Sequence, residues 1–354
     1  MKKLLWLAGI ILGIMAFSCH ETGNKAKEAS TGRVEPQDSL MILAKTFFKA
    51  LPATAEDSAN HITAAKVHLG KVLFYDVRLS KSGTVSCNSC HELTSFGVDH
   101  TPTSTGENGH RGTRNSPTVF NAALQNMQFW DGRARTIEEQ AGMPILNPVE
   151  MAIPHKGFLV NKLAAITIYQ DLFKKAFPGD DKPITYDNLQ NAIGAFERTL
   201  LTPSRFDKYL QGDQAALTAN EKQGLRVFIE AGCPSCHQGV TIGGQSLQRF
   251  GVVTDYRTLV KSKIDDEGRI AVTKKATDKD VFKVATLRNV AGTFPYFHNG
   301  SVAQLDSAVK IMGKAQLNKD LTQQQISQIV AFLNSLTGDV NPEVKKIPAE
   351  LVKK

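Results

Sequence analysis

Hydrophobic residues recur at helical spacing through most of this chain, and a clear example lies near its carboxyl end. There Thr322 and Gln325 form the capping-box signature of a helix start, and an apolar stripe runs from 326 to 336. Thr218 and Glu221 open a second segment in the same way. Further stripes with three- and four-residue spacing occur at 64–75, 158–177 and 189–200. No long stretch alternates polar and apolar residues, so the sequence predicts a mainly α protein with long loops.

Four of the five cysteines form two copies of a Cys-x-x-Cys-His motif, at Cys87, Cys90 and His91 and at Cys233, Cys236 and His237. This spacing is typical of haem c attachment, in which both thiols bond to the porphyrin and the histidine ligates the iron. The alternatives are disulfides, or a redox cysteine pair that happens to precede a histidine. Because the two copies use every cysteine except Cys19, we expect two covalently bound haem c groups.

A short pattern upstream of each motif also occurs twice. Gly70 and Phe74 precede the first motif, and Gly224 and Phe228 precede the second with the same spacing. This Gly-x-x-x-Phe repeat indicates duplication of a cytochrome unit, joined by a linker within 201–214. We therefore expect two cytochrome c-like haem domains in tandem, an N-terminal one at 41–205 and a C-terminal one at 206–354.

The amino terminus has the pattern of an export signal. Two lysines precede an uncharged stretch at 4–17, which is too short to span a bilayer comfortably. Ser18 precedes Cys19, as in bacterial lipoprotein signals, although an ordinary secretory signal is the alternative. The sequence thus predicts a signal peptide at 1–18 and a flexible tether at 19–40. The protein would work on the periplasmic side or in the cell envelope and meet the membrane only through a lipid anchor at Cys19.

Composition sets broader limits. The chain has 354 residues, of which 42% are hydrophobic and 21% charged, as in globular proteins of two ordinary domains. Lysine and arginine number 42 against 34 acidic residues, a formal net charge of +8. These charges are scattered and form no basic stripe, so no nucleic-acid partner is expected.

The two halves differ in the side chains available to an iron. Met312, in the same half as His237, could add a sulfur ligand, which raises the reduction potential of a haem, although a lone methionine is more often core. In the first half, Glu150 lies among apolar residues that would raise its pKa and suit it to proton transfer. Gln140 could orient a bound oxygen species, and Trp130 could bridge electrons. The alternatives are a capping glutamate, a surface glutamine and a core tryptophan.

In combination these residues resemble the bacterial di-haem cytochrome c peroxidases over roughly residues 64–338. Besides the haem motifs, the resemblance rests on Phe-Trp-Asp-Gly-Arg-Ala at 129–134, Glu-Glu-Gln-Ala at 138–141, Asn-Pro-Val-Glu-Met at 147–151, Leu-Arg-Asn at 287–289, Pro-Tyr-Phe-His-Asn-Gly at 295–300 and Met312-Gly313. It implies an enzyme that reduces hydrogen peroxide to water. The electrons would come from a small cytochrome c or similar donor and enter at the C-terminal haem.

The resemblance also implies roles for individual residues. Glu150 would be the acid–base group, Gln140 its partner on the peroxide side, Trp130 the residue between the haems, and Met312 the distal ligand of the second haem. Family members hold a calcium ion at the domain interface and are commonly homodimers. The matching calcium positions here are Asn115, Thr293 and Pro295, the last two acting through main-chain carbonyl oxygens.

One loop departs from the family pattern. Many members place a histidine after the first haem motif, where it caps the peroxide-binding iron, but here that position holds Glu107. Either His110 reaches the iron through a shifted loop, or the first haem is open at rest, which we favour. Two other functions stay open: a di-haem oxidase of a protein substrate, against which Met312 argues because those relatives have tyrosine there, and a di-haem electron carrier without peroxidase activity.

Overall fold

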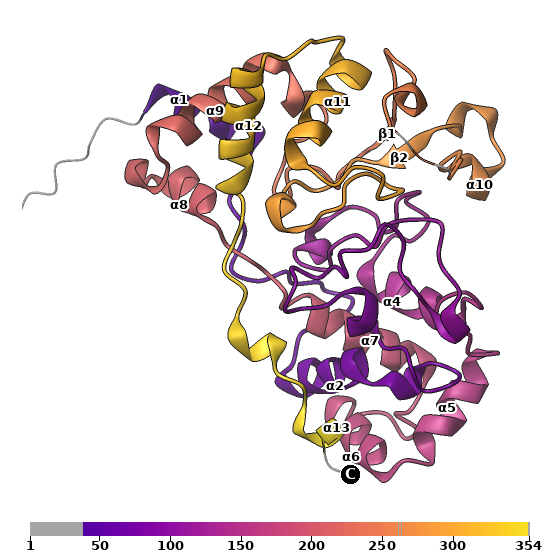
Figure 1. Ribbon diagram of the computed structural model, residues 1–354. Coiled ribbons are helices and arrows are strands. Elements are labelled where there is room, and N and C mark those ends of the chain that lie inside the picture. The colour runs from indigo at the N-terminus through magenta and orange to yellow at the C-terminus, as the bar shows by residue number, and fades with distance from the viewer. Residues whose placement is uncertain (1–37, 261, 263, 353–354) are drawn as a thin grey trace, which may run out of the picture. The chain divides into compact units, whose positions relative to one another are not determined.

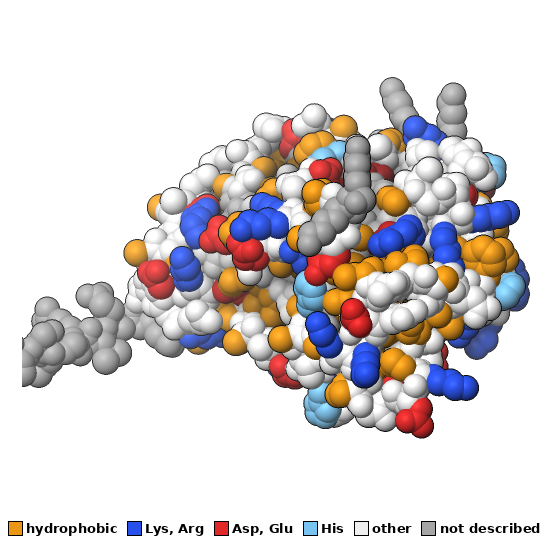
Figure 2. All heavy atoms as spheres, turned by 90° about the horizontal axis from the view of Figure 1, so that it is seen from below, with side chains coloured by type: hydrophobic (Ala, Val, Ile, Leu, Met, Phe, Trp, Pro, Cys, Tyr) orange, Lys and Arg blue, Asp and Glu red, His pale blue; other side chains and the backbone are white. Residues whose placement is uncertain are grey.

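The computed structural model of the protein describes residues 38–260, 262 and 264–352. The predicted signal peptide, Cys19 and the tether up to residue 37 lie outside the described residues, and helix α1 (Ser39–Phe47) already begins where the tether was expected to end. In the described part of the chain, no helix is both long and apolar enough to cross a bilayer. On the face drawn in Figure 2, basic and acidic side chains are interspersed rather than segregated.

Helices dominate the fold, which confirms the mainly α prediction (Figure 1). The sheet formed by described residues is a single antiparallel pair, β1 (Leu247–Arg249) and β2 (Val281–Lys283), with Leu247 opposite Lys283. The longer helices after α1 are α2 (Ala64–Tyr75), α4 (Ile137–Leu146), α5 (Lys156–Ala164), α6 (Thr167–Ala176), α7 (Tyr186–Glu197), α8 (Arg205–Gln211), α9 (Ala219–Ala231), α11 (Leu305–Leu317) and α12 (Gln323–Asn334). Short helical turns are α3 (Cys87–Cys90), α10 (Ile270–Thr273) and α13 (Ala349–Val352).

The first of two hydrophobic clusters is built around the crossing of α2 and α7, with α4, α5 and α6 packed against it. The crossing is close because Gly70 has no side chain: a Cβ there would lie 1.9 Å from the carbonyl oxygen of Ala192. Phe74, one turn further along α2, meets Phe196 edge to face at a centroid distance of 5.4 Å. The first Gly-x-x-x-Phe pattern is therefore a helix-crossing signature.

The second cluster repeats this geometry where α9 crosses α12. A Cβ on Gly224 would lie 1.9 Å from the carbonyl oxygen of Gln328, and Phe228 meets Phe332 at 5.3 Å. Both predicted capping boxes, at the starts of α9 and α12, are formed. The matched pair of crossings supports the expected architecture of two cytochrome-like halves.

Each end of the described chain packs on the half that is more distant from it in sequence. Helix α1 contributes Leu40, Met41 and Ala44 to the second cluster, beside α8. After α12 the chain returns to the first cluster, where Val344 is buried and its carbonyl oxygen accepts a hydrogen bond from the Tyr75 hydroxyl at 2.8 Å. Contacts thus cross the expected boundary between residues 205 and 206 at both ends, and that boundary stays a prediction.

Two expected elements differ in detail. The single amphipathic helix expected at 158–177 is two helices, because Ile166 is extended between α5 and α6 and packs against the first cluster. The expected linker at 201–214 contains α8, whose start is stabilised by a capping box between Ser204 and Asp207. Asp207 also pairs with the fully buried Arg288, which fixes α8 to the second half.

Candidate active site

The first Cys-x-x-Cys-His motif forms its own short helical turn, α3. The backbone N–H of Ser86 donates to the Ser89 hydroxyl at 3.0 Å, so the residue between the cysteines closes the turn. Both cysteines are free thiols, and burial raises the pKa of Cys90 to about 11 and that of Cys87 further. The motif therefore presents two protonated thiols and an adjacent buried histidine, the groups that haem c attachment requires.

A cavity with about 960 Å³ of empty space lies beside this motif. Apolar side chains make much of its wall, including Val85, Ala141, Pro144, Val149 and Met151. The polar residues that line it include Gln140, Glu150 and Glu197. The structure thus brings two of the three predicted catalytic side chains, Gln140 and Glu150, to the cavity that also contains His91, whereas Trp130 does not line it.

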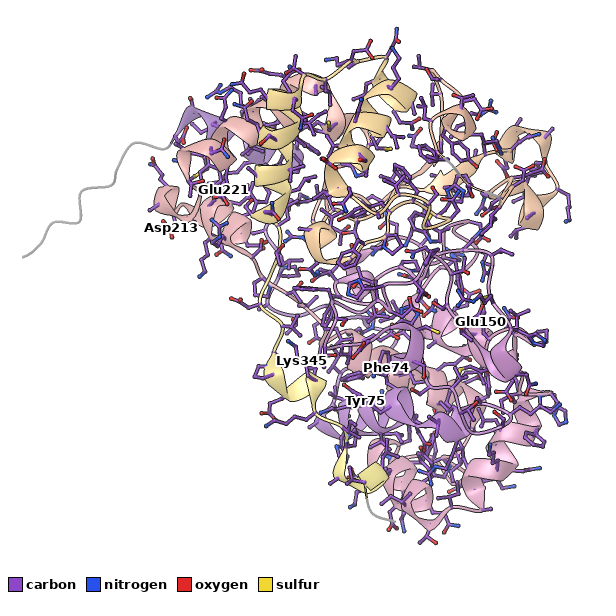
Figure 3. All side chains as sticks on the ribbon, viewed as in Figure 1. Phe74, Tyr75, Glu150, Asp213, Glu221 and Lys345 are labelled. Atoms are coloured by element: carbon purple, nitrogen blue, oxygen red, sulfur yellow. The ribbon has the colours of Figure 1, made fainter. Side chains whose placement is uncertain are left out.

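Glu150 lies in a tight loop after α4 (Figure 3). The loop is fixed by Asn147, whose carbonyl oxygen accepts the Glu150 backbone N–H at 3.1 Å and whose amide donates to the Glu150 carboxylate at 2.7 Å. Burial raises the pKa of Glu150, while Arg133 and the Asn147 hydrogen bond oppose the rise. The carboxyl group is consequently easier to protonate than a carboxyl in water, as proton transfer near neutral pH requires.

The second motif opens on a more apolar cavity, with about 1220 Å³ of empty space. Met312 of α11 lines this cavity together with Cys233, Cys236 and His237. Burial lowers the pKa of His237 to about 4, so its imidazole is neutral and free to ligate a metal. The first cavity therefore offers carboxyl and amide groups beside its histidine, whereas the second offers a thioether sulfur.

Trp130 connects the two cavities. Its ring lines the second one, and its indole N–H donates to the main-chain oxygen of Asn115 at 2.8 Å, a residue that lines the first. The ring also meets His298 edge to face at a centroid distance of 6.3 Å.

Comparisons with known proteins agree with this geometry. The family model for di-haem cytochrome c peroxidases matches residues 64–215. The chain is 48% identical over 303 residues to a cytochrome c551 peroxidase of Pseudomonas aeruginosa, covering 85% of this chain and 87% of the relative. It belongs to the di-haem cytochrome c peroxidase family.

Other members of the family are similarly close. A cytochrome c551 peroxidase of Nitrosomonas europaea is 47% identical over 283 residues, covering 80% of this chain and 82% of the relative. Among solved structures, that of a MauG-like protein associated with microbial copper homeostasis superposes with a TM-score of 0.75 at 28% identity, covering 85% of this chain and 97% of that one.

The loop that departs from the family pattern is folded against the catalytic segment. The Glu107 backbone N–H donates to the Glu150 carbonyl oxygen at 2.8 Å, and the buried Glu107 carboxylate accepts from the backbone N–H of Ser82 at 2.7 Å. His110 is exposed and is not among the residues that line the first cavity. Neither Glu107 nor His110 is among the residues that line the cavity containing His91.

Glu197 is a residue that the sequence analysis missed. It ends α7, lines the first cavity close to Cys87, and is 3% exposed. Burial, with help from the nearby charge of Glu138, raises its pKa to about 8 against the opposing effect of Arg198. The available signal was its position four residues after Ile193 on the apolar stripe, where a charged residue is out of place.

The three expected calcium positions are only partly linked. Asn115 donates its backbone N–H to His298, three residues beyond Pro295, and donates its side-chain amide to the Thr101 carbonyl oxygen. The Asn115 amide oxygen accepts no hydrogen bond from the described residues. The Thr293 hydroxyl donates to the Val290 carbonyl oxygen at 3.3 Å. No hydrogen bond within the described ranges joins Asn115 to Thr293 or Pro295.

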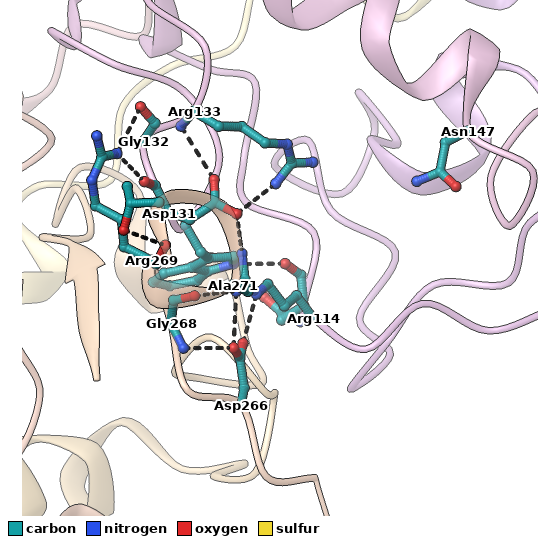
Figure 4. A network of polar contacts seen from close by, with 12 residues as sticks. Arg114, Asp131, Gly132, Arg133, Asn147, Asp266, Gly268, Arg269 and Ala271 are labelled. Carbon is teal, nitrogen blue, oxygen red and sulfur yellow. Dashed lines mark hydrogen bonds and ion pairs between the residues drawn. The ribbon is translucent and has the colours of Figure 1, made fainter. Parts of the chain in front are cut away.

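A buried ion network joins the halves beside Trp130 (Figure 4). Arg114 pairs with Asp131 at 2.6 Å and, through two nitrogens, with Asp266 of the second half at 2.6 and 2.8 Å. Asp131 also accepts from Arg133 at 2.8 Å, and its carbonyl oxygen accepts from Arg269. The network holds the turn that carries Trp130 against the second half.

Proposed function

We propose that this chain is a di-haem cytochrome c peroxidase that reduces hydrogen peroxide to water with electrons from a small cytochrome c or a similar donor. The observation that carries the proposal is the difference between the two cavities. One histidine faces a carboxyl group of raised pKa and an amide, whereas the other shares its cavity with a methionine sulfur. A pure electron carrier would need no such carboxyl group beside a haem.

The residues present fit two haem c groups. Each motif supplies two free thiols for thioether bonds and a histidine for the iron, beside a cavity of about 960 or 1220 Å³ with largely apolar walls. When bound, the haems supply the iron that takes peroxide and the electrons that reduce it. We assign the peroxide reaction to the half that contains His91 and electron entry to the half that contains His237 and Met312.

In this mechanism Glu150 moves the protons. Cleaving the oxygen–oxygen bond of hydrogen peroxide to give two waters consumes two protons and two electrons. As a carboxylate, Glu150 can take the proton of one peroxide oxygen and pass it to the other oxygen, which leaves as water, and its raised pKa makes it a stronger base for the first transfer. Gln140 orients the peroxide without adding charge, and the apolar wall of Ala141 and Val149 excludes water.

The same assignment gives Met312 and Trp130 their roles. A thioether ligand favours the reduced state of a haem, so the second site stores an electron. Trp130 lies on the line of contacts from that site, through the Asn115 carbonyl oxygen, to the first cavity. Electrons would pass through this region to the peroxide site.

Replacing Glu150 tests the proposal. The variant Glu150→Gln keeps the size of the side chain but cannot carry a proton, so both haems should bind with unchanged spectra while peroxide turnover falls at least about 100-fold, the usual contribution of a general acid–base group. Glu139→Gln, on the exposed side of α4, is the matched control and should keep wild-type turnover. Unchanged turnover in Glu150→Gln would refute the proton role.

Four further features are proposed for this chain. A calcium ion would use the free amide oxygen of Asn115 and the main-chain oxygens of Thr293 and Pro295. The first haem would be open at rest, which is consistent with a Glu107 carboxylate that accepts from Ser82 and does not line the first cavity. Export through the predicted signal would bring the protein to the periplasmic side, with a lipid anchor at Cys19. The working form would be a homodimer.

A further inference from the structure

Lys283, on β2, is a buried lysine without an acidic partner. It is 5% exposed, and its ammonium group donates to the side-chain oxygen of Gln125 at 2.5 Å, a neutral group. No ion pair among residues 38–260, 262 and 264–352 includes Lys283. Burying a cation without an ion pair costs free energy of folding. The presence of a lysine at this buried position therefore indicates that its charge has a function.

The position of Lys283 ties it to the second cavity. Its side chain lines that cavity together with Trp130 and Met312. Its backbone N–H donates to the Trp130 carbonyl oxygen at 2.6 Å, and the neighbouring Phe282 stacks on His298 at a centroid distance of 4.0 Å. The lysine is therefore part of the wall between the tryptophan and the second haem site.

The lysine keeps its charge at neutral pH. Burial lowers its pKa to about 8, which still exceeds 7, and the carboxylate of Asp131 helps to retain the proton. That carboxylate does not cancel the charge, because it is already paired with two guanidinium groups, those of Arg114 and Arg133. A net positive charge thus remains at the edge of an apolar cavity, where screening by water is weak.

We propose that the positive charge of Lys283 raises the reduction potential of the second haem. Reduction of that haem adds one electron and lowers its net charge by one, so a fixed neighbouring cation stabilises the reduced form. The effect has the same sign whether the ammonium group acts on the iron directly or on a porphyrin carboxylate. This inference rests on the proposed haem site at Cys233–His237 and adds a second cause, besides Met312, for a high potential there.

Three substitutions and a control separate the effect of charge from that of structure. Lys283→Met removes the cation and keeps the chain length, whereas Lys283→Arg keeps the cation. Gln125→Glu leaves the lysine in place but puts a carboxylate on its ammonium group, so it neutralises the charge without touching β2. Lys279→Met removes an exposed lysine of the same segment, which pairs with Glu267 at the surface, and is the matched control.

The measurement is the midpoint potential of each haem in the haem-loaded protein, by spectroelectrochemistry. Lys283→Met and Gln125→Glu should each make the second haem at least about tenfold harder to reduce, a fall of 59 mV for one electron, and leave the first haem unchanged. Lys283→Arg and Lys279→Met should keep the wild-type potentials.

An unchanged second potential in Lys283→Met or in Gln125→Glu, with both haems bound, would overturn the inference. So would an equal fall in Lys283→Arg, which would indicate a packing role. If Lys283→Met fails to bind haem, Gln125→Glu still decides the question. A wild-type protein that lacks a second haem or has equal potentials would instead refute the proposed function.

Discussion

At the residue scale, Glu138 and Glu197 show how the protonation state of a carboxyl group depends on whether a cation pairs with it. Glu138 forms hydrogen bonds with the Arg198 guanidinium, which holds its pKa below the usual range. Glu197, immediately before that arginine in sequence, has no hydrogen-bond partner for its carboxyl group among the described residues, and burial raises its pKa to about 8. The neighbouring guanidinium is committed to Glu138 and Asp57, so one carboxyl group is charged and the other is held neutral beside the first cavity.

The raised pKa of Glu197 predicts a pH-dependent stability. Between the ordinary pKa of 4.5 and about 8, the unfolded chain loses this proton while the folded protein keeps it, so the free energy of unfolding falls as pH rises. Glu197→Gln cannot lose a proton, so its free energy of unfolding lacks this dependence on pH. Its advantage over wild type should grow between pH 5 and pH 8, by up to about 1.4 kcal/mol per pH unit. Denaturant midpoints at the two pH values check this, and a constant difference would contradict it.

At the element scale, the two halves share one packing arrangement. In each half, a helix that contains a glycine crosses a second helix, and a carbonyl oxygen of the second helix lies at the point of closest approach. Any side chain on Gly70 or Gly224 would overlap that oxygen. The phenylalanine one turn later then packs against a phenylalanine of the partner helix within the hydrophobic cluster. Close backbone approach is the physical reason for glycine in the middle of α2 and α9, where it is otherwise unfavourable.

Alanine substitutions distinguish this packing role from helix propensity. Gly70→Ala and Gly224→Ala should each destabilise the protein by about 1–3 kcal/mol or more, because the added methyl group overpacks the crossing. Gly157→Ala in α5 is the control, since its Cβ would meet only His155, at 3.5 Å. That change should be neutral or stabilising by up to about 1 kcal/mol. Midpoints of thermal unfolding give the comparison, and equal effects in all three variants would exclude the crossing argument.

The local features of these elements could be predicted from the sequence, and the long-range ones could not. The haem motifs, the capping boxes at Thr218 and Thr322 and the helical stripes depend on neighbours within a few residues. The burial of Lys283 and Glu197 depends on segments more than a hundred residues away, as does the packing of α1 on the second cluster. The neighbours of Gln140, Glu150 and Trp130 made them candidates but left capping, surface and core roles open, and the family resemblance favoured the catalytic roles.

At the scale of the whole molecule, buried polar contacts join the halves in addition to the apolar packing of the two chain ends. Arg114 bridges Asp131 and Asp266, the Asn115 backbone N–H reaches His298, and Lys283 binds the main chain of Trp130. Each of these contacts also lies beside Trp130 or the second cavity. The connection between the halves therefore fixes the same region through which electrons are proposed to pass.

Breaking the ion pair between Arg114 and Asp266 should lower the free energy of unfolding substantially. Asp266→Asn leaves part of the Arg114 charge uncompensated in a buried site, and we expect a loss of about 3 kcal/mol, as for other broken buried pairs. Asp265→Asn, next in sequence and 77% exposed, loses only a surface pair with Arg257 and should change stability by less than about 1 kcal/mol. Denaturant unfolding of the haem-loaded variants tests this, and equal losses in both would show that burial of the bridge is unimportant.

The exchanged chain ends have a consequence for how the protein matures. The first cluster is completed by Val344 and its neighbours, near one end of the described chain, and the second by Leu40 and Met41, near the other end. Neither half can bury its full core without residues far away in sequence, so assembly involves long-range contacts. A protease cut around residues 201–205 would leave two fragments still bound to each other, because each fragment packs against the terminal segment of the other.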